Sequence, residues 1–153
     1  MANDKKKIEV KYETLVIIWT ALLFSQVMFV AVVYFVKPEL FSLDFSKPPL
    51  GDQPLITIVF AIIAIATLGL SVVLRRQHME RAARDHDAGC VQTGLVLGCA
   101  LSEISFILGL ILALAFSYPY FLFWNILGLL GILFHFPRRG NYDAALFGRD
   151  RRY

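Results

Sequence analysis

Long apolar stretches dominate the chain and set its organisation. Four runs without Lys, Arg or Asp cover residues 14–36, 55–74, 91–116 and 118–136. About 20 apolar residues cross the roughly 30 Å hydrocarbon core of a bilayer, so each run predicts one transmembrane helix. The fourth span, counted over residues 119–136, is close to the lower limit of about 17 residues. The pattern therefore predicts an all-α integral membrane protein with four transmembrane helices.

The polar ends of the chain frame this membrane domain. We expect the four helices to form one domain over residues 14–136, with an N-terminal extension of residues 1–13 and a basic tail of residues 137–153. Lysines before an apolar run also resemble a signal peptide. However, the first run exceeds the 7–15 or so residues of a signal peptide's apolar region, and no A-x-A cleavage pattern follows it. We therefore interpret the first run as a retained helix.

Positive charges are distributed unevenly between the segments that connect the runs. Thirteen of the fifteen Lys and Arg residues precede the first run, separate the second from the third, or follow the fourth. The first loop, residues 37–54, holds only Lys37 and Lys47. The positive-inside rule then places both termini and the central loop in the cytoplasm, as in a multi-pass protein of the cell inner (cytoplasmic) membrane. We therefore attribute the net charge of +3 to membrane orientation. The lipid bilayer is the expected partner, and no nucleic acid is expected.

One ionisable side chain interrupts the third run. Glu103 lies near its middle, where a carboxylate costs about 3 kcal/mol or more and usually faces a protein interior or an ion path. Glu103 is therefore the first candidate for ion binding; the alternative is a protonated carboxyl in a structural hydrogen bond with another helix. Ser25 and Gln26 fall at a similar depth in the first run. Gln26 either forms an ordinary helix–helix hydrogen bond or helps to satisfy Glu103.

The third run carries two distinct helical faces. At 100° per residue, small side chains gather in a groove that lets another helix approach closely. The members of this groove are Gly94, Gly98, Ser102, Ser105, Gly109 and Ala113. Glu103 projects about 130° from the centre of the groove, on the face that carries Gln92, Cys99, Phe106 and Leu110. We include Gln92 and Gln26 with Glu103 in the candidate ion-binding set.

The fourth run is predicted to form an antiparallel hairpin with the third, because only the turn at residues 117–119 separates them. Pro119 suits the first turn of the new helix. Asn125, Gly128, Gly131 and His135 share one face, which we expect to pack on the small-residue groove, with Asn125 hydrogen-bonding across it. We interpret His135 as an interfacial histidine, with a proton relay as the alternative.

The outer end and the two polar flanks suggest contacts with the membrane surface. Aromatic residues at the outer end of the fourth run are typical of an interfacial belt. They are Tyr118, Tyr120, Phe121, Phe123 and Trp124. In the first loop, Phe41, Leu43 and Phe45 alternate with polar residues, as in a segment that lies on the membrane or on a partner. The tail is expected to be weakly ordered, along anionic headgroups or docked on a larger complex.

The segment TGLVLGCALSEISFILGLILALAF resembles the second, ion-binding helix of the c subunit of rotary ATP synthases. The matching residues are Ala100, Leu101, Glu103, Gly109 and the aliphatic run 110–114. Arg76-Gln77 is similar to the start of that family's cytoplasmic loop. In the family, the carboxyl binds and releases a proton or a sodium ion as a ring of subunits turns. The resemblance implies that Glu103 is an ion carrier.

The remaining sequence offers no pattern for catalysis, a metal or a cofactor. Cys90 and Cys99 are about 13 Å apart along one helix, which is too far for a disulfide, and they are too few for a metal site. His78 and His86 fit no metal-ligand spacing with the acids near them. We find no nucleotide-binding loop and no nucleophile with its base, so an enzyme is not expected.

Two functions remain open. The leading one is a small non-catalytic membrane subunit that assembles with itself or with a larger bioenergetic complex, with Glu103 buried at a helix interface. The alternative is a c-subunit-like protein that translocates protons or sodium ions with Glu103 as carrier.

Overall fold

The computed structural model describes residues 11–42 and 46–147, with side chains up to residue 143. Within these ranges, helices are the only regular secondary structure, so the all-α fold class is confirmed. The elements in chain order are α1 (Tyr12–Val36), η1 (Pro38–Phe41), α2 (Pro54–Asp85), α3 (Ala88–Phe116), α4 (Phe121–Phe134) and α5 (Arg139–Phe147).

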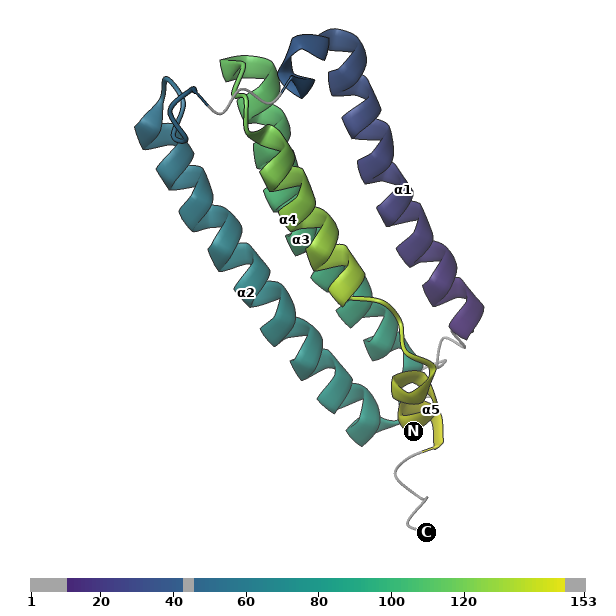
Figure 1. The fold of residues 1–153 in the computed structure, drawn as a ribbon. Coiled ribbons are helices and arrows are strands. Elements are labelled where there is room, and N and C mark those ends of the chain that lie inside the picture. Colours follow the sequence, from purple (N-terminus) through teal and green to yellow (C-terminus); the bar gives the residue numbers. More distant parts are fainter. Residues whose placement is uncertain (1–10, 43–45, 148–153) are drawn as a thin grey trace, which may run out of the picture.

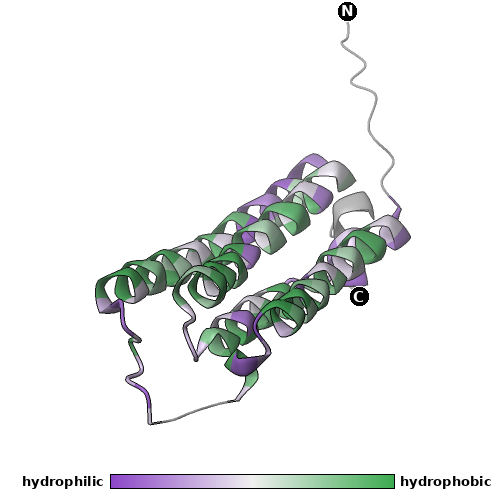
Figure 2. Ribbon diagram, turned by 90° about the horizontal axis from the view of Figure 1, so that it is seen from above, coloured by the Kyte–Doolittle hydropathy of each residue, from purple (hydrophilic) through white to green (hydrophobic). Residues whose placement is uncertain are grey.

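The helices form an elongated bundle with α3 at its centre. In Figure 1, α1 and α2 flank the pair formed by α3 and α4, and α5 lies at one end of the bundle. Helix α3 packs against α1, α2, α4 and α5, and its most extensive contacts are with α2 and α4. Figure 2 shows that apolar residues cover most of the length of the long helices, and polar residues concentrate near their ends. The central helix is also the one that carries Glu103.

Three helices, α1, α2 and α3, are long and apolar enough to cross a membrane. The fourth predicted span is shorter than expected, because α4 has 14 residues and a length of about 21 Å. Helix α4 begins at Phe121 rather than near Pro119, since Tyr118 and Tyr120 are held by the first loop. Helices α2 and α3 are longer than their apolar runs, with 32 and 29 residues.

Helices α2 and α3 form a hairpin through a turn of two residues. His86 adopts a left-handed conformation with φ of 50° and ends α2. Asp87 is the N-cap of α3, and its carboxylate accepts a hydrogen bond of 2.8 Å from the backbone N–H of Gly89. This is the usual N-cap arrangement, which satisfies a free backbone donor. The basic segment after the second apolar run is therefore a helical extension of α2 up to Asp85.

The opposite end of the bundle is held together by polar side chains of the first loop and the α3–α4 turn. Tyr118 and Tyr120 donate hydrogen bonds of 2.6 and 2.7 Å to the backbone carbonyls of Pro49 and Lys47. The Lys37 ammonium donates to the Leu114 carbonyl at 2.8 Å, near the negative end of the α3 dipole.

The prediction of an interfacial aromatic belt is wrong for most of its residues in the described part of the chain. Of the five belt aromatics, only Phe123 is well exposed, and the other four are buried in the core between the helices. In the first loop, half-buried Phe41 packs edge-on against Phe121 and Tyr34, and contact of this loop with a membrane surface or a partner stays a prediction. Leu43 and Phe45 lie outside the described residues.

The C-terminal tail contains a helix where the sequence predicted weak order. Helix α5 packs against α2 and α3. Tyr142 of α5 lies against Tyr12 of α1, with ring centroids 5.9 Å apart. The tail therefore closes the polar end of the bundle as far as the structure describes it.

Candidate functional site

The candidate site lies where α3 meets α1, and the two faces of α3 create it. The small-residue face of α3 lets α4 approach closely. An added Cβ at Gly109 of α3 would lie 2.6 Å from the Trp124 Cβ and 3.3 Å from the Phe121 carbonyl oxygen of α4, which leaves no space for a side chain. This close approach fixes the rotation of α3. The acid face, with Cys99 and Phe106 buried and Glu103 half-buried, is thereby turned toward α1.

Glu103 has a hydrogen-bonding partner on α1. The Ser25 Oγ lies 3.4 Å from the Glu103 Oε1, a distance longer than the usual 2.5–3.0 Å or so for O–H···O bonds. The same hydroxyl donates to the Leu22 carbonyl at 2.7 Å. A hydroxyl has one hydrogen, and the shorter bond to Leu22 uses it. The Ser25 oxygen is then free to accept a hydrogen bond from a protonated Glu103 carboxyl.

Gln26 does not satisfy Glu103. Its side chain is 2% exposed, and neither its amide nitrogen nor its carbonyl oxygen has a hydrogen-bond partner among the described residues. The residue before it, Ser25, makes the contact instead. An unpaired buried amide is costly, by about 1–3 kcal/mol. Gln26 is therefore not a ligand of the acid, and its amide is unpaired among the described residues.

Gln92 is too far from Glu103 to share an ion with it. Both residues lie on the uninterrupted helix α3, eleven positions apart. At 1.5 Å per residue, the separation along the helix axis is about 16 Å. The structure therefore divides the predicted ion-binding set, and only Glu103 retains a polar contact across the α1–α3 interface.

Asn125 of α4 and Gln26 of α1 line one cavity of about 140 Å³, together with Phe106 of α3. Asn125 is 4% exposed, and we predicted that its amide would hydrogen-bond across the α3–α4 interface. Neither of its polar side-chain atoms has a partner in the described part of the chain. Its Oδ1 instead lies 3.0 Å from the position of a Cβ added at Gly109, so the amide fills the groove by shape alone.

The other residues of the predicted packing faces lie at helix contacts. Gly94 faces His78 and Met79 of α2, and Gly98 faces the ring of His135. Gly131 lies against Ser102 of α3 and Leu68 of α2. Ser105 is fully buried, and its hydroxyl has no partner among the described residues. One continuous stripe of small residues thus meets two different helices.

His135 is buried rather than interfacial. Its ring is 1% exposed, and the Nδ1 lies 2.8 Å from the Gly131 carbonyl oxygen. The ring fills the gap that the missing side chain of Gly98 leaves on α3. The Nε2 has no partner within the described residues. His135 lies only three residues before Arg138, and this position suggested the membrane interface. The helical face that His135 shares with Gly128 and Gly131 indicated burial instead.

Sequence reasoning missed two polar contacts that attach α1 to α4 and to the residues that follow it. The Trp19 indole N–H donates to the Ile132 carbonyl at 2.8 Å, and the Tyr12 hydroxyl donates to the Pro137 carbonyl at 3.0 Å. Both acceptors are backbone groups, so no residue type in α4 signals them. The indole N–H of Trp19 is the one signal that could have found the first contact, because a buried indole usually needs a hydrogen-bond acceptor.

Chemically, the site can hold a proton and exchange a hydrogen bond, and it carries no nucleophile with an adjacent base. No group of three metal-ligating side chains comes together in the described ranges. No protein-family model, no curated protein and no solved structure matches this chain.

Proposed function

We propose that this chain is a small, non-catalytic membrane subunit that assembles with itself or with a larger bioenergetic membrane complex. In this proposal it spans the inner membrane four times, with both termini in the cytoplasm. Glu103 forms a structural hydrogen bond between α1 and α3. The observation that carries the proposal is the position of this single acid, half-buried against Ser25 between two long apolar helices.

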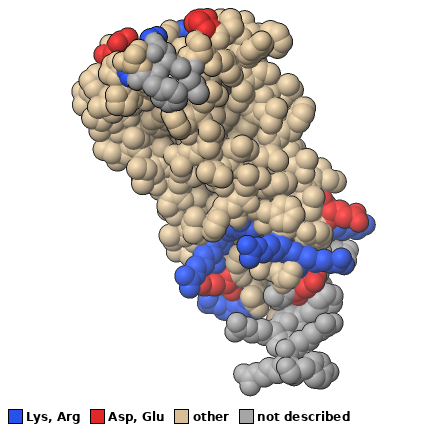
Figure 3. Space-filling view, viewed as in Figure 1, with Lys and Arg blue, Asp and Glu red and all other residues tan. Residues whose placement is uncertain are grey.

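The distribution of charge supports the orientation. Figure 3 shows Lys and Arg gathered around one end of the molecule, beyond a long uncharged body. Helix α1 begins at that end, α4 ends there, and α5 lies there (Figure 1). Under the positive-inside rule this end faces the cytoplasm. Cysteine residues introduced singly at Arg81 and at Lys47 test this: a membrane-impermeant maleimide should label the Lys47 position from outside intact cells and leave the Arg81 position unlabelled.

Helix α4 is the weakest of the four proposed spans. Its 14 residues are about 9 Å short of a hydrocarbon core of roughly 30 Å. The flanking residues shorten this deficit, because Tyr118, Tyr120 and His135 are buried against the bundle rather than exposed to lipid. Arg75 satisfies the carbonyls of Phe134 and Phe136 at the other end, so the backbone beyond α4 keeps its hydrogen bonds.

The outer faces of the bundle support assembly within the membrane. Many large apolar side chains on α1 and α2 are exposed, including Phe35 at 82% and Leu55 at 75%. Such surfaces suit lipid or another transmembrane helix. Gentle extraction of the full chain from its own membranes should recover one defined assembly, either of several copies or with other subunits. Recovery of a monomer alone in every mild detergent would contradict the proposal.

A second function, c-subunit-like transfer of protons or sodium ions by Glu103, is favoured by one geometric feature. The carboxyl is partly exposed, and the Ser25 contact is long, so the acid is not locked into a short hydrogen bond. A proton could leave and return without disruption of the helix packing. The resemblance of residues 91–116 to the ion-binding helix of that family points the same way.

A carbodiimide reagent separates the two functions. It modifies protonated carboxyl groups within membranes, and the variant Glu103→Gln serves as the control for the site. Under the structural role, Glu103 is not labelled, or its labelling is unchanged by sodium. In neither case does labelling alter ion flux. Under the ion-carrier role, Glu103 is labelled, sodium or high pH protects it, and ion flux in proteoliposomes stops with both the label and Glu103→Gln.

A further inference from the structure

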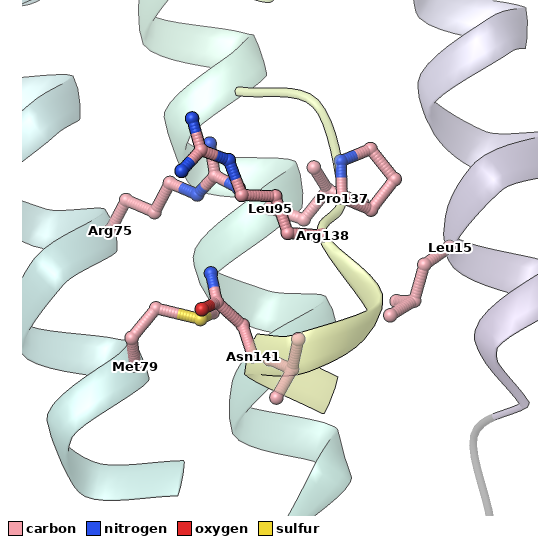
Figure 4. Close-up of a pocket in the computed structure, with 8 residues that line it drawn as sticks. Leu15, Arg75, Met79, Leu95, Pro137, Arg138 and Asn141 are labelled. Carbon is pink, nitrogen blue, oxygen red and sulfur yellow. The ribbon is translucent and has the colours of Figure 1, made fainter. Parts of the chain in front are cut away.

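A cavity of about 260 Å³ lies at the polar end of the bundle, between α2, the end of α4 and α5. Arginine residues dominate its polar lining: Arg75 and Arg76 come from α2, and Arg138 precedes α5. Asn141 of α5 adds an amide, and Val72 and Phe134 add apolar walls. Figure 4 shows Arg75, Arg138 and Asn141 around a small adjoining cavity that the same residues line.

The positive charges of this cavity are poorly balanced. The one salt bridge among the described residues joins Arg76 to Glu80, at 3.0 Å and with both side chains well exposed. Arg75 and Arg138 have no carboxylate partner in the described part of the chain. Their guanidinium groups line the same two cavities, so their like charges repel one another. An anion placed between them would remove this repulsion.

Arg75 is held in place for such a contact. Its Nη1 and Nη2 donate hydrogen bonds of 3.0 and 2.9 Å to the carbonyls of Phe134 and Phe136. A guanidinium has five N–H groups, and these two bonds leave others available. Arg138 makes no side-chain hydrogen bond within the described residues, so its donors are free for a ligand. Guanidinium groups match phosphate oxygens in geometry and charge, which makes phosphate the anion that suits this pair.

The residues around the cavity indicate which kind of molecule carries the phosphate. Arg75 directly follows the apolar run 55–74, at the level where hydrocarbon gives way to lipid headgroups. Val72 and Phe134, exposed by 43% and 66%, continue the wall of the cavity along the apolar body of the bundle. A ligand with a phosphate head and hydrocarbon tails would contact both parts. We propose that this cavity binds the phosphate of an anionic phospholipid headgroup from the cytoplasmic leaflet.

The proposal rests on the placement of the bundle in a bilayer, so the test first separates insertion from lipid binding. Resistance of the full-length protein to alkaline extraction from membranes reports insertion alone. Native mass spectrometry of the purified full chain, titrated with phosphatidylglycerol or phosphatidylcholine, then reports binding. The variant Arg138→Gln removes the unpaired guanidinium, and Arg139→Gln is the matched control, because Arg139 is exposed and does not line the cavity.

We expect phosphatidylglycerol to bind about tenfold more tightly than phosphatidylcholine, and Arg138→Gln to remove most of that preference. Arg139→Gln should keep it within about twofold, since a single exposed charge adds little. Equal affinity for both lipids, or equal loss in both variants, would overturn the proposal. Addition of glycerol phosphate or inorganic phosphate tests whether the cavity prefers a lipid headgroup to a soluble phosphate compound. Displacement of the lipid by either compound at equal concentration would show a site for soluble phosphate instead.

Discussion

Helices α1 and α3 are similarly long and apolar, yet they have different places in the molecule. Half of the most apolar window of α3 is buried inside the bundle, against 11% for α1. Helix α3 contains four glycines, and α1 contains none. Apolarity alone therefore marks a helix for the membrane, whereas small side chains decide which helix lies at the centre. Small side chains let helix backbones approach closely, which improves van der Waals packing between helices in lipid.

The largest expected effect comes from overfilling the tight contact between α4 and α3 at Gly128 of α4. A Cβ added at Gly128 would meet the side chain and backbone of Phe106 at 2.9 and 3.1 Å, and the backbone cannot move aside cheaply. Gly128→Leu should lower the free energy of unfolding by about 3 kcal/mol, as overpacking does. Gly69→Leu is the control, because no atom lies within 4 Å of its added Cβ. Unfolding in SDS–detergent mixtures, followed by tryptophan fluorescence, measures the free energy of unfolding of each variant. Equal stability of the two variants would disprove the tight contact.

The one deeply buried polar residue of α1 offers the reverse test. Gln26 has no partner for its amide among the described residues, so Gln26→Leu should raise the free energy of unfolding by about 1 kcal/mol. Gln92→Leu, the same exchange at a half-buried position of α3, should change it little. The same unfolding assay applies. A loss of stability in Gln26→Leu would mean that the amide has a partner and that α1 is bound more strongly than the structure shows.

A smaller effect is expected at the polar attachment of α1 to α4. Trp19→Phe removes the indole donor to the Ile132 carbonyl and keeps most of the apolar surface. The loss should be about 0.6 kcal/mol, the typical worth of such bonds between helices in a membrane. Leu23→Ile, a change without a polar contact in the same half-buried helix face, serves for comparison. If Trp19→Phe lowered the free energy of unfolding by several kcal/mol, α1 would be bound to the bundle more strongly than this account predicts.

The sequence predicted the long helices from the lengths of their apolar runs, and the two faces of α3 from helical periodicity. Runs of apolar residues marked α1, α2 and α3, and the spacing from Gly94 to Gly109 marked the contact face. Details that depend on the rotation or ends of a neighbouring helix were beyond it. Ser25 and Gln26 are adjacent and point about 100° apart, so only the orientation of α1 decides which one meets Glu103. Likewise, the start of α4 at Phe121 depends on the loop that holds Tyr118 and Tyr120.

The position of Glu103 between α1 and α3 is the claim on which both proposed functions depend, and crosslinking in native membranes tests it directly. In a chain with Cys90 and Cys99 replaced by Ala, the pair Ser25→Cys and Glu103→Cys is treated with a short bifunctional thiol reagent. Val27→Cys, on an exposed part of α1, replaces Ser25→Cys in the control. The structure predicts rapid crosslinking within one chain for the Ser25 pair and little for the control. Faster reaction of the Val27 pair, or links only between separate chains, would contradict it.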